Sequence, residues 1–145
     1  MSINSQITAT VTKYFKERPN VAAVYLYGSQ ARGDEKQGSD IDLAVLFSKK
    51  QKPTSSDMPQ VTFIQELTKR MGRKVDVQDL KNCRVDFTHR VLSEGRLLIS
   101  NNEVERVEFE ENILQRYFDL KPMFKEYYKS LSEIAKKGEI GVRLL

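Results

Sequence analysis

The chain has 145 residues, of which 39% are hydrophobic and 30% charged, and its 24 Lys and Arg against 20 Asp and Glu give a formal net charge of +4. These values favour one folded domain over a disordered chain. The sequence shows no apolar run near the roughly 20 residues of a membrane-spanning helix, no signal peptide, and a single cysteine, which excludes an internal disulfide. We therefore expect a cytoplasmic protein, and the basic balance leaves nucleic acid open as a partner.

Hydrophobic periodicity predicts helices and strands that alternate along the chain. The elements expected before the C-terminal region are, in order, a helix at 3–18, a strand at 21–27, a strand at 40–47, a helix at 57–71, a strand at 74–80, a helix at 85–94 and a strand at 96–100. From residue 101 or 102, apolar side chains keep helical spacing as far as Ile134, which indicates one long helix with Pro122 as the place for a bend. This order indicates an α/β domain at 1–137 and a tail at 138–145.

Three aspartates stand on two of the predicted strands. Asp40 and Asp42 are two residues apart, so their side chains leave the same face of one strand about 7 Å apart at the backbone. Two carboxylates about 5 Å apart repel by about 3 kcal/mol at an effective dielectric near 20, so a close pair needs a cation or a raised pKa. Asp76 joins them if its strand pairs beside theirs. Three such carboxylates suit Mg²⁺ or Mn²⁺ and two-metal nucleotidyl transfer.

A Gly-rich polar loop at 28–39 precedes the first two aspartates. Gly28, Ser29 and Arg32 offer backbone N–H groups, a hydroxyl and a guanidinium, all of which are donors suited to a triphosphate. Taken alone, the aspartate pair also fits the solvated face of an edge strand, and the glycine-serine pair also fits a simple turn. Their joint order, with a further aspartate on a later strand, favours a nucleotide-transfer site.

Other motifs fit less well. Residues 28–33 have the G-x-x-x-x-G spacing of a P-loop, but the next two residues are acidic instead of Lys and Ser or Thr. An EF-hand is excluded because apolar residues follow Asp42 where oxygen ligands and a glycine are needed. Cys83 and His89 lie about 240° apart on a helix, so we interpret both as structural. The lysines at 49, 50 and 52 have no aromatic platform, which favours a solvated loop.

The stretch Gly28-Ser29, ten residues and Asp40-x-Asp42 resembles the signature of the polymerase-β-type nucleotidyltransferase superfamily. Gly-Ser-x-Ala-Arg-Gly followed by Ser-Asp-Ile-Asp-Leu-Ala-Val is similar to its minimal nucleotidyltransferase (MNT) branch, and the resemblance spans nearly the whole chain. Many members of that branch are antitoxins paired with HEPN-domain RNase toxins. The resemblance implies the nucleotidyltransferase fold, a short mixed sheet packed by helices with a long C-terminal helix.

The same resemblance implies an activity, the Mg²⁺-dependent transfer of AMP from ATP to a tyrosine hydroxyl of a cognate HEPN toxin, which silences the toxin. The implied roles are phosphate binding by Gly28 and Ser29, with help from Arg32 and Ser39, and metal binding by Asp40, Asp42 and Asp76. Asp76 would also help to deprotonate the incoming hydroxyl. Two alternatives stay open: an antitoxin that acts by binding and occlusion only, and a nucleotidyltransferase for a small molecule of the aminoglycoside type.

We expect the acceptor to lie on another polypeptide, because larger relatives that modify antibiotics or RNA carry an additional domain. Its docking surfaces would be the tail at 140–145 or the part of an aromatic face on the long helix that is not packed against the sheet. We expect most of that face, which comprises Tyr117, Phe118, Phe124, Tyr127 and Tyr128, to be core. Part of the positive charge should serve the triphosphate, with neither nucleic acid nor a membrane as a direct ligand; the cations concerned are Arg32, Arg70, Arg73 and Lys74.

Overall fold

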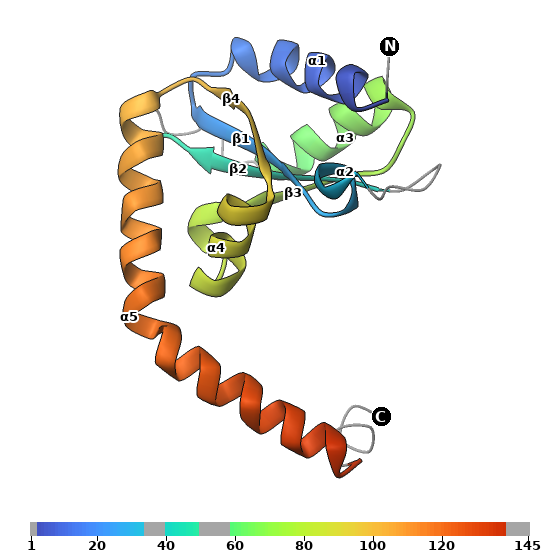
Figure 1. The fold of residues 1–145 in the computed structure, drawn as a ribbon. Coiled ribbons are helices and arrows are strands. Elements are labelled where there is room, and N and C mark those ends of the chain that lie inside the picture. The colour runs from blue at the N-terminus through green and yellow to red at the C-terminus, as the bar shows by residue number, and fades with distance from the viewer. Residues whose placement is uncertain (1–2, 34–39, 50–58, 139–145) are drawn as a thin grey trace.

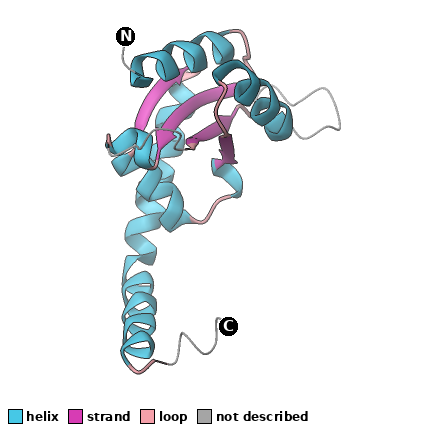
Figure 2. Ribbon diagram, turned by 90° about the vertical axis from the view of Figure 1, so that its right-hand side faces the viewer, coloured by secondary structure: helices cyan, strands magenta, loops and turns pink. Residues whose placement is uncertain are grey.

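The computed structural model describes residues 3–33, 40–49 and 59–138. In these ranges, helices lie on both faces of a four-stranded sheet (Figures 1 and 2). The elements are α1 (Ile3–Lys16), β1 (Val21–Tyr27), α2 (Ser29–Arg32), β2 (Ile41–Phe47), α3 (Pro59–Met71), β3 (Val75–Asp79), the 3-10 helix η1 (Leu80–Asn82), α4 (Val85–Glu94), β4 (Arg96–Ser100) and α5 (Glu103–Lys136). No helix in the described part of the chain combines the length and apolarity needed to cross a membrane.

The strand order is β3-β2-β1-β4, and the sheet is mixed. β1 pairs antiparallel with both β2 and β4, whereas β2 and β3 run parallel. A parallel pair needs a crossover connection, and α3 lies within the one that joins β2 to β3. The expected short mixed sheet is therefore confirmed, and β2 and β1 are its central strands.

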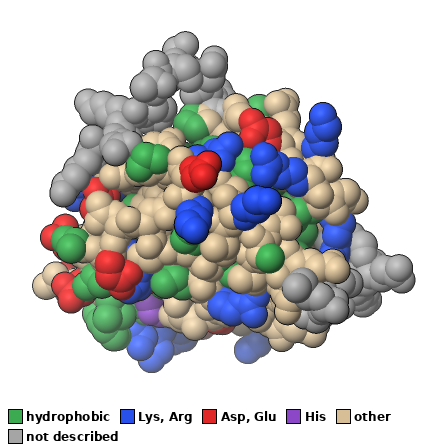
Figure 3. All heavy atoms as spheres, turned by 90° about the horizontal axis from the view of Figure 1, so that it is seen from above, with side chains coloured by type: hydrophobic (Ala, Val, Ile, Leu, Met, Phe, Trp, Pro, Cys, Tyr) green, Lys and Arg blue, Asp and Glu red, His purple; other side chains and the backbone are tan. Residues whose placement is uncertain are grey.

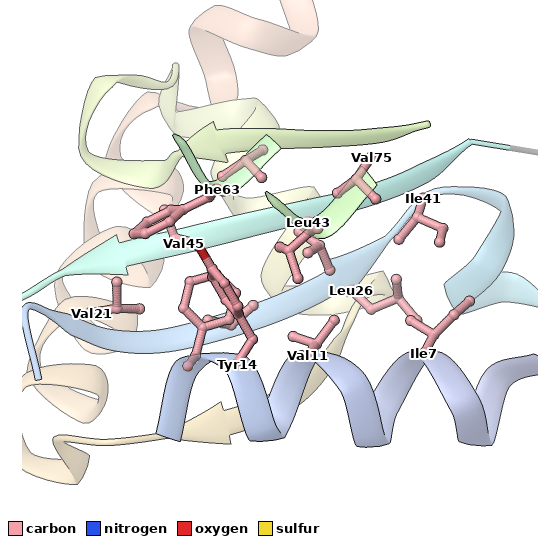
Figure 4. Close-up of a cluster of buried hydrophobic side chains, with 14 residues drawn as sticks. Ile7, Val11, Tyr14, Val21, Leu26, Ile41, Leu43, Val45, Phe63 and Val75 are labelled. Carbon is pink, nitrogen blue, oxygen red and sulfur yellow. The ribbon is translucent and has the colours of Figure 1, made fainter. Parts of the chain in front are cut away.

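One face of the sheet is covered by α1 and α3. The buried side chains of α1 follow the spacing that predicted this helix, and they pack with Phe63 of α3 against alternate residues of β1 and β2 (Figure 4). Ile41, Leu43 and Val45 of β2 all belong to this cluster. Since successive strand residues point to opposite faces, the even-numbered residues of β2 face the other side.

The second face is covered by α4 and the first half of α5. Tyr25, Ala44 and Leu46 form its apolar centre together with Val91 of α4, and Phe109 of α5 packs against them. The Tyr25 hydroxyl donates to Glu110 Oε1 at 2.6 Å, which fixes α5 to β1. This is also the face to which Asp42 belongs by strand alternation.

The long C-terminal helix begins where the sequence predicted. The Asn102 side chain accepts a hydrogen bond from the Glu105 backbone N–H at 3.1 Å and so caps α5. The helix contains Pro122 and is bent in its central part (Figure 1). Beyond the bend it extends past the sheet, away from the rest of the domain (Figures 1 and 2).

The expectation that most of the aromatic face of α5 is core was wrong. Phe118, Tyr127 and Tyr128 are 58%, 49% and 46% exposed. The physical reason is that this part of α5 lies beyond the sheet, and within the described residues its partners come from α4: the Tyr117 ring stacks on His89 with ring centroids 3.6 Å apart, and the Tyr128 hydroxyl donates a hydrogen bond to Asp86. Of the described residues of α5, Ile113 is the one that is buried.

Two short helices lie where none was expected. α2 forms inside the predicted Gly-rich loop, and η1 follows β3 directly. The described part of the second long helix, α3, begins at Pro59, and its predicted start at Asp57 lies outside the described residues.

Candidate active site

Three side chains from three strands lie side by side on the α4 face of the sheet. Asp42 of β2 has Tyr27 of β1 as its cross-strand partner on one side and Asp76 of β3 on the other. All three residues are half-buried. The pairing of β3 beside β2 is what the sequence required for Asp76 to join the other aspartates, and the structure confirms that pairing.

Asp42 lies at the centre of a cluster of negative charge. Burial raises the pKa of its carboxyl above the ordinary value, and the charges of Asp76 and Asp40 raise it further. The cations of Arg32 and Lys74 act in the opposite direction without cancelling the rise. The site therefore holds carboxylates whose mutual repulsion a bound cation would relieve.

The two outer aspartates differ in their surroundings. Asp40 precedes β2 with an exposed side chain, and its Oδ2 lies 3.9 Å from Lys74 Nζ, which makes a weak, solvent-screened ion pair. Asp76 Oδ2 accepts a hydrogen bond from Gln78 Nε2 at 2.9 Å. The Gln78 amide therefore orients Asp76 from the same strand.

The donor set fits a hard divalent cation by type. Its members are carboxylate oxygens, which Mg²⁺ and Mn²⁺ prefer, and after burial the charges of Asp76 and Asp40 contribute to the raised pKa of Asp42. Across residues 3–33, 40–49 and 59–138, no three Asp, Glu, His or Cys side chains converge closely enough to enclose an ion. Asp42 and Asp76 are direct neighbours across two paired strands.

The loop after β1 lies directly against the Asp42 carboxylate. Gly28 has φ +75° and ψ −153°, a backbone conformation that is almost confined to glycine. A Cβ atom placed on Gly28 would stand 2.5 Å from Asp42 Oδ2, so a larger residue would displace the carboxylate. Ser29 opens α2, and Arg32 closes it with its backbone N–H bonded to the Gly28 carbonyl at 3.2 Å. Glycine, serine and arginine are thus held beside the aspartates.

The expected phosphate-binding cations separate into two groups. Arg32 and Lys74 act electrostatically on Asp42. Arg70 instead lies 4.9 Å from the Tyr14 ring centroid on the α1 and α3 face, and Arg73 lines a cavity there with Ile41. Figure 3 looks onto α1 from the side opposite α4, and Lys and Arg side chains gather on that face. Ser39 lies outside the described residues.

Sequence reasoning missed Tyr27 and the contribution of α4. Burial raises the pKa of the Tyr27 hydroxyl, and so do the charges of Asp42 and Asp76. Its ring meets Phe87 of α4 edge-on, with centroids 5.5 Å apart. Both rings line a cavity of about 200 Å³ that also includes Gly28, Arg32, Arg90 and Glu94. The alternation that places Tyr25 on this face is the signal that assigns Tyr27 to it as well.

Residues 9–104 match the family model described as polymerase beta, nucleotidyltransferase, and the match includes the whole sheet, the glycine-serine loop and all three aspartates. The protein belongs to this family and is a nucleotidyltransferase. The protein adenylyltransferase MntA of Shewanella oneidensis is 29% identical to it over 80 residues, which are 55% of each chain. The alignment therefore covers about half of that relative.

Two solved structures share the fold. A chain in a crystal structure of a toxin-antitoxin with AMP-PNP superposes with a TM-score of 0.71 at 21% identity, covering 86% of this chain and 98% of that one. A chain in a structure of the tri-AMPylated Shewanella oneidensis HEPN toxin in complex with MNT antitoxin gives 0.68 at 19% identity, covering 90% and 99%. These likenesses confirm the nucleotidyltransferase fold that the sequence predicted.

Proposed function

We propose that this protein is an antitoxin that transfers AMP from ATP to a tyrosine hydroxyl of a cognate HEPN RNase toxin in the cytoplasm, and so neutralises it. The observation that carries the proposal is the placement of Asp42 beside Asp76 with Gly28 packed against the Asp42 carboxylate. The similarity to MntA and the fold shared with chains from toxin-antitoxin structures support the choice of acceptor.

The reaction forms one bond and breaks one. The tyrosine oxygen attacks the α-phosphorus of ATP, the bond from that phosphorus to the bridging oxygen breaks, and pyrophosphate leaves. Gly28 and Ser29 bind the phosphates, Arg32 offsets their charge, and Ser39 adds a further contact. Asp76 accepts the proton of the attacking hydroxyl. Mg²⁺, held by Asp40, Asp42 and Asp76, would supply charge neutralisation at the phosphates.

The test is transfer of AMP to the cognate toxin, followed by intact mass and by identification of the modified residue. The wild-type protein with ATP and Mg²⁺ should add one or more AMP units to a tyrosine. Asp42→Asn should slow transfer by about 100-fold or more, because it removes a carboxylate that would hold the Mg²⁺ needed at the phosphates. Glu17→Gln, which changes an exposed carboxylate just after α1, is the matched control and should keep the wild-type rate.

Two outcomes would contradict the proposal. A toxin that stays unmodified but is inhibited equally by wild type and by Asp42→Asn would indicate occlusion alone. Transfer of AMP to a small hydroxylated molecule, with the toxin left unmodified, would indicate a small-molecule nucleotidyltransferase.

A further inference from the structure

We propose that the cavity between β2, η1 and the first half of α5 receives the polypeptide segment beside the acceptor tyrosine, and that this segment is acidic. The inference rests on the proposed function, since it assumes a protein acceptor, and it adds the direction of approach and the chemistry of the docked segment. It follows from the order of the groups across the sheet, the position of the cavity and the charges that line it.

The order of groups across the sheet sets the direction of approach. The glycine-serine loop follows β1, Asp42 lies on β2, and Asp76 lies on β3 at the edge of the described sheet. In phosphoryl transfer the attacking and leaving oxygens stand roughly in line on opposite sides of the phosphorus. With the leaving phosphates at the Gly28 loop, the acceptor has to come from the side that holds Asp76.

A cavity of about 420 Å³ lies between β2, η1 and the first half of α5, and η1 directly continues β3, the strand that holds Asp76. Leu46 and Leu80 line this cavity. Leu46 lies four residues after Asp42 on β2, and Leu80 lies four residues after Asp76, just past the end of β3. Four extended residues span about 13 Å, which is the distance from the aspartates to these leucines along the strands. Cys83, also in the lining, is near enough to raise the pKa of the Tyr27 hydroxyl by its charge. A tyrosine side chain with one or two extended residues bridges this span, so the residues flanking the acceptor reach the cavity.

The charges around the cavity favour an acidic segment. Lys49, Lys81 and Arg116 line it, and none of their side chains forms a salt bridge within the described ranges. Of the two carboxylates in the lining, Glu105 already accepts hydrogen bonds from Ser48 Oγ at 2.8 Å and from the Lys49 backbone N–H at 3.1 Å. Three cations therefore line the cavity with two carboxylates, Glu105 and Glu108, so the lining carries a net positive charge.

A second groove provides the competing surface. It lies between α4 and the second half of α5, has a volume of about 380 Å³, and contains Lys121 and Lys125. It shares Arg90 and Glu94 with the cavity beside Gly28 and Arg32. This groove therefore adjoins the side where the phosphates leave, which is the wrong side for the attacking hydroxyl.

The two surfaces offer matched charge-reversal variants at exposed cations. We would compare the double variant Lys81→Glu with Arg116→Glu against the double variant Lys121→Glu with Lys125→Glu. The readouts are the KM and kcat of AMP transfer to the cognate toxin, the affinity for the toxin without ATP, and the affinity for AMP-PNP with Mg²⁺. Thermal unfolding confirms that each variant is folded.

The first pair should raise the KM for the toxin and weaken toxin binding by about 10-fold or more, because it places two negative charges against an acidic segment. Its kcat and its affinity for AMP-PNP should stay within about 2-fold of wild type. The double variant Lys121→Glu with Lys125→Glu should stay within about 2-fold of wild type in KM, kcat, toxin affinity and AMP-PNP affinity. Added salt should raise the wild-type KM, because it screens the attraction, and should lower the KM of the first pair, because it screens the repulsion.

An unchanged KM and toxin affinity in the first pair would overturn the inference, and so would an equal loss in both pairs. A wild-type protein that binds the toxin through Lys81 and Arg116 without modifying it would contradict the proposed function and leave the docking surface in place. The binding and transfer readouts therefore separate the two failures.

Discussion

A side chain at position 28 would occupy space that the Asp42 carboxylate fills. The residue that follows β1 must therefore be glycine for Asp42 to keep its position. The substitution Gly28→Ala would place a Cβ 2.5 Å from Asp42 Oδ2 and would also strain a backbone at φ +75°. We expect AMP transfer to fall by about 10-fold or more, since a displacement of about 1 Å in a catalytic group costs about that much or more. The measurement is kcat/KM for transfer, with thermal unfolding measured in parallel.

Gly72→Ala is the control for backbone strain. Gly72 has φ +64°, and a Cβ there would meet nothing within 4 Å. The substitution should lower the free energy of unfolding by about 1 kcal/mol, as a left-handed alanine does, without changing transfer. Equal loss of activity in both variants would show that strain, and not contact with Asp42, explains the Gly28 result.

At this scale the sequence predicted that Asp76 would join the other aspartates if its strand paired beside theirs, and the structure shows Asp76 next to Asp42 across that pair of strands. The roles of Ser39 and of the aspartates as metal ligands remain predictions. Tyr27 was missed because its importance depends on which strand pairs beside β2, and that pairing cannot be read from local spacing. Arg70 was assigned to the nucleotide from nearness in sequence, whereas its guanidinium lies over Tyr14 on the other face.

At the scale of elements, one hydrogen bond joins the second half of α5 to α4. The Tyr128 hydroxyl donates to Asp86 Oδ2 at 2.6 Å, and Asp86 Oδ1 also accepts from the Phe87 backbone N–H. Tyr128→Phe should lower the free energy of unfolding by about 1 kcal/mol and speed hydrogen exchange in α5 beyond the bend. Tyr127→Phe changes a neighbouring exposed ring whose hydroxyl bonds to no side chain or backbone group within residues 3–33, 40–49 and 59–138, and it should leave both quantities unchanged.

The contribution of the Tyr128–Asp86 hydrogen bond to the free energy of unfolding should depend on pH. The bond from Tyr128 lowers the pKa of Asp86 below its ordinary value of 3.8, with smaller contributions from the Phe87 N–H and Arg84. Because the folded pKa is depressed, the contribution to stability is present above pH 3.8 and is lost as the pH falls through the folded value. The difference in unfolding free energy between wild type and Tyr128→Phe should therefore shrink below that pH, and a constant difference would contradict this assignment.

Long elements were predicted better than short ones. The start of α5, expected at residue 101 or 102, followed from the helical spacing of its apolar residues, and the helical period of α1 matches its buried face. α2 and η1 were not predicted, because four or three residues are too few to show a period. The aromatic residues of α5 have the spacing of a core helix. Only the tertiary structure shows that the helix extends beyond the sheet, which leaves part of this face exposed.

At the scale of the molecule, the two halves of α5 contribute unequally to the fold. A chain shortened to end at Leu120 keeps Phe109, Glu110 and Ile113 and loses mainly exposed side chains and the bond to Asp86. Its melting temperature should fall by about 5 °C or less.

The comparison is a chain shortened to end at Glu108. It removes the acceptor of the Tyr25 hydroxyl and uncovers the second apolar cluster, so it should unfold at a much lower temperature or fail to fold. Similar melting temperatures for the two shortened chains would contradict the unequal division of α5.

The parallel pairing of β2 with β3 also sets the order in which the site can form. Gly28 and Asp42 leave the ribosome well before Asp76, which reaches them only after the crossover through α3 has folded back onto the sheet. The bond that seals the same face, from Tyr25 to Glu110, joins residues 85 positions apart. A nascent chain therefore carries the Gly28–Ser29 loop and Asp42 before Asp76 can join them, and the three-strand arrangement of the candidate site forms only once the α3 crossover has folded.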